Sequence, residues 1–222
     1  MKQSNKFLYL FIISILISSS NSFGQNDHWE KNVTYNNIKF KKVRFLIENS
    51  DTLQISGILK NNTVIDGIPC KKNIVFNRNW QIRTFILADD YQMMGSLFPE
   101  GTRVSYGSKS IVILFGKDTE FQNYCCNGNF NRWYSTGIFT VLYPSGKLKA
   151  FYSCKNVTID GIYCKSSPFS SVRLHENGKL KECNLAKKQI INGKSFKKNT
   201  ELIFDEKGNI ESAVTSFFWW FI

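Results

Sequence analysis

Apolar and polar residues alternate along most of this chain, and short turn signals interrupt the alternation. Apolar Val172 and Leu174, for example, precede the pair Asn177-Gly178, and Leu180 follows it. An alternation with a period of two residues predicts β-strands, and Asn-Gly between two such arms predicts a hairpin turn. Beyond residue 24 the chain has no 3.6-residue period, so the pattern predicts strands without helices.

The same pattern occurs six times at nearly regular intervals. When the turn is placed at Gly178, the positions six before, four before and two after it are apolar, and the corresponding positions of the other units are apolar or, once, threonine. The six turns fall at spacings of 29, 30, 36, 32 and 30 residues, at Asp51, Trp80, Ser110, Gly146, Gly178 and Gly208. Self-similarity at a period near 30 residues predicts a repeat architecture.

A second motif, apolar-x-Gly, follows each of the first five turns, with its glycine thirteen to sixteen residues after the turn. In the third unit Asn123 replaces the glycine, and asparagine is the usual substitute where the backbone needs a positive φ. We expect the apolar residues of these motifs to be buried together in one stripe. They are Ile65, Met93, Phe121, Ile159 and Ile191.

These patterns predict an all-β fold: an elongated sheet or solenoid of about six stacked β-hairpin repeats. Each hairpin would be completed by a short third strand or turn around the apolar-x-Gly motif. One hairpin alone is marginal in water, whereas stacked units share a core. The predicted organisation is a signal peptide at 1–24, an N-terminal segment at 25–42 and a single repeat domain at 43–222.

The N-terminus predicts export. Lys2 and Lys6 precede an unbroken apolar run over 7–17, which is too short to span a bilayer comfortably, and small residues flank Phe23. These features are typical of a secretory signal peptide with cleavage near Gly24. The sequence therefore predicts a secreted or periplasmic protein without a transmembrane helix in the mature chain.

The repeat motif, N-G-K-L-K followed by I-x-G and then F-x-x-x-G-x-I, resembles the MORN-repeat-variant proteins of bacteria. The best match runs from Val141 to Ile210, and the resemblance covers most of Val43 to Val214. It implies an elongated sheet of stacked hairpins and a role in binding or scaffolding, with no shared catalytic residues. The chain departs from the family in its extra cysteines and in an insert from Cys125 to Trp133.

The formal net charge is +12, and removal of two signal-peptide lysines leaves about +10. This excess of positive charge favours anionic partners. The lysines are spread along the chain, however, and can also serve solubility alone. The leading interpretation is a non-enzymatic binding or scaffolding module of the cell envelope with an unknown protein or anionic partner. The alternatives are a basic protein that binds anionic lipid or glycan and, less favoured, an outer-membrane β-barrel. No nucleic acid, cofactor or metal is expected.

The insert over 127–133 interrupts the period and carries the candidate binding residues Phe130, Arg132 and Trp133. Insertions in repeat proteins map to loops on one face, and arginine and tryptophan are enriched in binding hot spots. The alternative is that Trp133 only covers an end of the sheet. No catalytic residues are predicted, and His175 is expected to face solvent.

The six cysteines permit disulfides in an oxidising compartment. Cys70, Cys126 and Cys164 share a repeat position with Phe98 and Phe196, which predicts that they are buried. Cys154 takes the position of two alanines and is expected to be small and buried. The most favoured single bridge joins Cys164 to Cys183, because the chain after Cys164 can fold back on the next hairpin. The rival prediction leaves every cysteine reduced.

Overall fold

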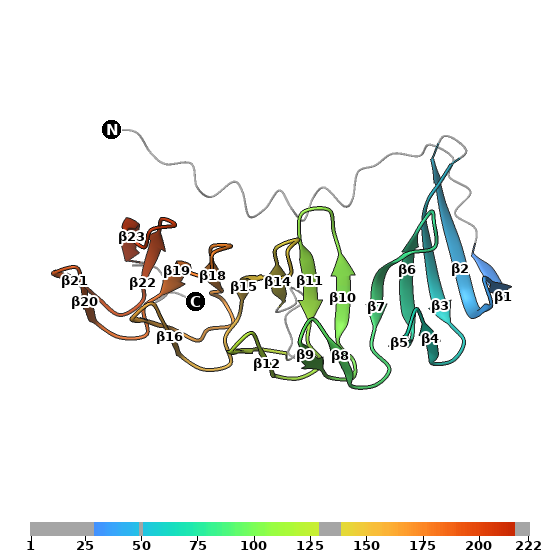
Figure 1. Ribbon diagram of the computed structural model, residues 1–222, viewed down its shortest axis with the longest axis horizontal. Helices are drawn as coiled ribbons and strands as arrows, with labels where there is room; N and C mark the ends of the chain where they lie inside the picture. Colours follow the sequence, from blue (N-terminus) through green and yellow to red (C-terminus); the bar gives the residue numbers. More distant parts are fainter. Residues whose placement is uncertain (1–28, 49–50, 129–138, 216–222) are drawn as a thin grey trace, which may run out of the picture.

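The computed structural model describes residues 29–48, 51–128 and 139–215, and all regular structure within them is β (Figure 1). No helix in these three ranges could cross a membrane. Thirteen strands form one antiparallel sheet whose order follows the chain from β1 at one end to β23 at the other. They are β1 (Glu30–Tyr35), β2 (Ile38–Glu48), β3 (Asp51–Leu59), β6 (Asn73–Asn77), β7 (Ile82–Ile86), β10 (Arg103–Tyr106), β11 (Ile111–Leu114), β14 (Thr140–Leu142), β15 (Leu148–Phe151), β18 (Val172–Leu174), β19 (Leu180–Asn184), β22 (Thr200–Phe204) and β23 (Ile210–Thr215).

This elongated sheet confirms the predicted hairpin repeats. The six predicted hairpins are β2–β3, β6–β7, β10–β11, β14–β15, β18–β19 and β22–β23. In the fifth hairpin the Gly178 amide donates to the His175 carbonyl at 2.9 Å, and Gly178 adopts a φ of 87°. A further hairpin, β1–β2, precedes them, so the sheet begins within the predicted N-terminal segment 25–42.

The apolar-x-Gly motifs form five small two-stranded hairpins, where the sequence had predicted one short strand or turn. Their strands are β4 (Thr63–Ile65) with β5 (Ile68–Cys70), β8 (Tyr91–Met93) with β9 (Ser96–Phe98), β12 (Thr119–Phe121) with β13 (Tyr124–Cys126), β16 (Val157–Ile159) with β17 (Ile162–Cys164), and β20 (Gln189–Ile191) with β21 (Lys194–Phe196). In Figure 1 they follow the lower edge of the sheet.

Both central residues of each small turn have a positive φ, as two-residue hairpin loops of type I′ require. Asp66 and Gly67 have φ values of 50° and 79°, and Gln122 and Asn123 have values of 48° and 68°. Asparagine therefore takes the glycine position of the third unit, as predicted. The local chemistry of these turns fixes the register of each small hairpin.

The core lies on one face of the sheet and includes the small hairpins. Ile65, Phe121 and Ile159 are buried in it, while Met93 and Ile191 are half-buried and pack against it. These five residues form the predicted stripe. The neighbouring repeat position is also buried as predicted in four units, since the residues there have no exposed surface: Cys70, Phe98, Cys126 and Cys164.

Replacing Ile159 by alanine should lower the free energy of unfolding by roughly 2–5 kcal/mol, because this side chain is only 4% exposed. The matched control is Ile190→Ala, since Ile190 is 74% exposed in the equivalent hairpin of the next unit. That change should cost no more than about 0.5 kcal/mol. Urea unfolding followed by circular dichroism measures both, and equal losses would contradict the assigned register.

Candidate functional site

The face of the sheet opposite the core carries one continuous row of cross-strand neighbours. Residues in this row pair strand by strand from β2 to β23, and all except one are half-buried. The row runs through Arg44, Ser56, Val75, Thr84, Ser105, Val112, Val141, Ala150, Arg173, Glu182, Ile203 and Ser212. Most of these side chains are small or β-branched, so they form a flat surface, which we call the outer face.

A β-bulge recurs next to the turn in several hairpins and adds a residue beside this row. In β15, Leu148 pairs with Leu142 and Ala150 pairs with Val141, which leaves Lys149 unmatched. Lys181 of β19 is unmatched in the same way, and so is Arg83 of β7. A bulge puts two residues opposite one and re-aims a side chain. The repeated bulge therefore gives a basic side chain a fixed place in three units.

A groove of about 340 Å³ lies on the outer face across β14, β15, β18 and β19. Its lining combines three aromatic and three basic side chains with a few small ones. The lining residues are Phe139, Val141, Tyr143, Lys149, Ala150, Tyr152, Ser171, Arg173, Leu174 and Lys181. The two lysines are the last residues of the two G-K-L-K motifs, Gly146–Lys149 and Gly178–Lys181. That repeated motif was the available sequence signal, and its significance for a site was missed.

Ring contacts and hydrogen bonds order the aromatic side chains of the groove. The Phe139 and Tyr152 rings meet edge to face, with centroids 6.2 Å apart, and Phe139 is 41% exposed. The Tyr143 hydroxyl donates to the Leu174 carbonyl at 3.0 Å. Desolvation, followed by the Glu176 and Glu206 carboxylates, raises the pKa of Tyr143, so this hydroxyl stays protonated at neutral pH.

The charges in the groove leave it net positive. Arg173 lies 3.4 Å from the Glu182 carboxylate, which offsets part of the charge of this one cation. Lys149 lies over the Tyr143 ring, with Nζ 5.2 Å from the ring centroid. In the part of the chain that the structure describes, no carboxylate forms an ion pair with Lys149 or Lys181. Two lysine charges are thus available to an anionic ligand.

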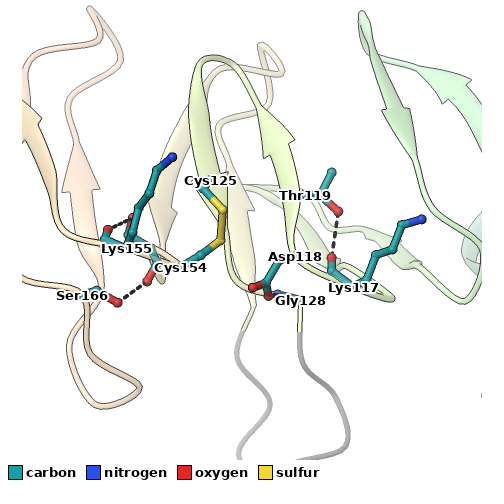
Figure 2. Close-up of a disulfide and its surroundings, with 9 residues drawn as sticks. Lys117, Asp118, Thr119, Cys125, Gly128, Cys154, Lys155 and Ser166 are labelled. Carbon is teal, nitrogen blue, oxygen red and sulfur yellow. Dashed lines mark hydrogen bonds between the residues drawn. A yellow bond between two sulfur atoms is a disulfide. The ribbon is translucent and has the colours of Figure 1, made fainter.

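A disulfide joins Cys125 to Cys154, which follows the groove residue Tyr152 by two positions (Figure 2). Cys125 belongs to β13, and the backbone just after that strand continues the contact: the Asn127 amide donates to the Tyr152 carbonyl at 2.7 Å. The cross-link therefore fixes the backbone that carries the Tyr152 ring. Cys154 was expected to be a small buried residue, but it is half-buried and bonded.

The insert begins from a close backbone contact beside this disulfide. The Gly128 amide donates to Asp118 Oδ1 at 3.0 Å, and a Cβ at Gly128 would lie 1.9 Å from the Lys117 carbonyl oxygen. Only glycine fits there. The predicted binding residues of the insert, Phe130, Arg132 and Trp133, lie outside the described residues. The first described residue after the insert is Phe139, which lines the groove.

Cys164 and Cys183 are free and buried in the structure, so the predicted bridge between them is absent. The chain does bring the two residues together, because Cys164 pairs with Leu185 of the following hairpin. A hydrogen bond to Cys183, followed by desolvation, raises the pKa of Cys164. The two thiols are thus in contact without a covalent bond.

His175 is buried, and its predicted exposure is wrong. The strand alternation ends at Leu174, and His175 begins the turn, so its side chain reaches the next unit. Its Nε2 lies 2.9 Å from the Phe204 carbonyl oxygen, to which it donates. Tyr143 makes the corresponding contact one unit earlier. Both residues connect neighbouring units.

Comparison with known proteins gives no match: no family model matches the chain, and neither does any curated protein or solved structure. The described ranges bring together no group of three side chains that could hold a metal ion.

Replacing Cys125 and Cys154 together by serine should lower the free energy of unfolding by roughly 3–4 kcal/mol, because the bridge closes a loop between residues 29 apart. Peptide mapping of the unreduced protein should find Cys125 linked to Cys154. The free energy of unfolding is compared with that of the double variant Cys164→Ser, Cys183→Ser, which removes the other thiol pair. A linked Cys164–Cys183 peptide would instead support the bridge predicted from the sequence.

Alkaline pH should weaken the fold through the buried thiols. Desolvation is the main cause that raises the pKa of Cys126 to about 12, while a free thiol ionises near 8.5. The unfolded state therefore loses its proton first as pH rises, so stability present below pH 8.5 declines between that value and 12. At pH 10 this one residue accounts for about 2 kcal/mol. Urea unfolding at pH 8 and pH 10 should show a smaller decline for Cys126→Ala than for the wild type.

Proposed function

We propose that this protein is a secreted or periplasmic, non-enzymatic binding module of the MORN-repeat-variant type, and that the groove on the outer face holds its ligand. The observation that carries this proposal is the meeting of three aromatic and three basic side chains in one concave surface. Ligand sites are typically concave and aromatic, with a few placed polar groups that fix orientation.

The cross-link beside the groove supports both parts of the proposal. Disulfides persist in oxidising compartments, which agrees with export through the predicted signal peptide. The bridge also holds Tyr152 in place, and rigid aromatic side chains bind with a small loss of conformational entropy. A repeat of stacked hairpins supplies a stiff, extended surface, as a scaffolding or binding module of the cell envelope requires.

The test uses the chain without residues 1–24 and an insoluble cell-envelope preparation, with binding measured by co-sedimentation. Tyr152→Ala should weaken binding at least tenfold, because truncation of an aromatic hot-spot residue typically costs about 2 kcal/mol or more. The control is Phe169→Ala, since Phe169 is a 78% exposed aromatic residue outside the groove. Equal binding by the two variants, with both folded, would refute the groove as the binding surface.

A further inference from the structure

We propose that the groove binds a linear anionic glycan whose chain runs across the strands, with its acidic groups on Lys149, Arg173 and Lys181. This inference rests on the proposed binding function and names its ligand class. Its basis is the order of charges and rings in the groove, which the bulges and the disulfide hold in place.

The three cations come from consecutive strands of the sheet. Lys149 is on β15, Arg173 on β18 and Lys181 on β19, and these strands pair directly. Neighbouring strands lie about 4.8 Å apart, so the backbone positions that carry the cations follow one another with about that step along the sheet. One ring of an extended glycan advances by a similar length. A polymer with an acidic group on successive sugars would thus meet a basic side chain at successive strands.

Phe139 and Tyr152 provide the apolar part of the site. The two rings lie at an angle of 80° to each other, so they form a corner and not a stack. The face of an aromatic ring carries partial negative charge, which attracts the weakly positive C–H groups of a sugar. Tyr143 is not part of this apolar surface, because its hydroxyl donates to the Leu174 carbonyl and Lys149 covers its ring. Its role is to position Lys149.

The sheet argues against an acidic peptide that binds as an added strand. Strands β14, β15, β18 and β19 each pair with a neighbour on both sides, so their backbone groups are already bonded. A peptide needs an open edge for that mode of binding. A lipid surface would need a larger apolar area, since Phe139 is the one strongly exposed apolar side chain among the groove residues.

Glu182 allows a test of whether the charge of the ligand determines its binding. Its carboxylate pairs with Arg173 at the border of the groove and opposes an anionic ligand. Glu182→Gln should release Arg173 and tighten binding of an acidic glycan about threefold, while a neutral glycan should gain nothing. A purely structural role of this ion pair predicts weaker binding of both.

The experiment measures binding of polygalacturonate and of heparin to the chain without residues 1–24, by isothermal titration calorimetry. At least one of these should bind, and the affinity should fall as salt is raised. Lys149→Ala with Lys181→Ala should weaken it about tenfold. The matched control is Lys147→Ala with Lys179→Ala, which removes the first lysine of each G-K-L-K motif and the same total charge, and it should bind within twofold of the wild type.

Three results would overturn the ligand class. They are binding of neither glycan, equal loss in both double-lysine variants, or a preference for methyl-esterified polygalacturonate, single-stranded DNA or vesicles of anionic phospholipid. Each of these leaves the proposed function standing if Tyr152→Ala still weakens binding to the cell envelope at least tenfold. Loss of that dependence on Tyr152 would refute the proposed function itself.

Discussion

The structure depends on the pairing between the second strand of each hairpin and the first strand of the next. The pairs β3–β6, β7–β10, β11–β14, β15–β18 and β19–β22 join separate hairpins into one sheet. A single hairpin cannot bury its apolar face, so each unit relies on its neighbours for a core. The small hairpins add to this dependence. The Leu180 amide donates to Asp160 at 2.8 Å, and the Lys165 amide donates to the Asn184 carbonyl at 2.7 Å.

This dependence separates the two faces of the sheet. The core face must hold large apolar side chains in every unit, and residues such as Phe85 and Phe151 have no exposed surface there. The outer face has no such requirement, because the pairing of the strands and the core face already stabilise each unit. Its side chains can differ from unit to unit at little cost. The positions of Lys149 and Lys181, for example, are those of the unmatched residues at the bulges that accompany the turns.

The turns and the buried stripe were predictable because their signals are local. A two-residue loop with positive φ favours Gly, Asn or Asp, and alternation identifies the inward residues. Contacts between units have no such signal. Cys125 and Cys154 occupy repeat positions that touch in other units, since the Ala186 amide donates to the Tyr163 carbonyl. Alternation does not reveal that contact, so the disulfide was missed. The groove was missed for the same reason, because its residues come from two hairpins.

The two tyrosines of the groove are replaced by other residue types at the equivalent positions of other units. By cross-strand pairing, Tyr143 corresponds to Asn77 and His175, and Tyr152 corresponds to Ile86 and Asn184. The sheet therefore forms with an amide, an imidazole or an aliphatic side chain at these positions, although Tyr143 and His175 each bond to the next unit. The unit with the tyrosines is also the one with the insert and the disulfide. These departures from the repeat therefore meet in one unit, which agrees with the binding function proposed for the groove.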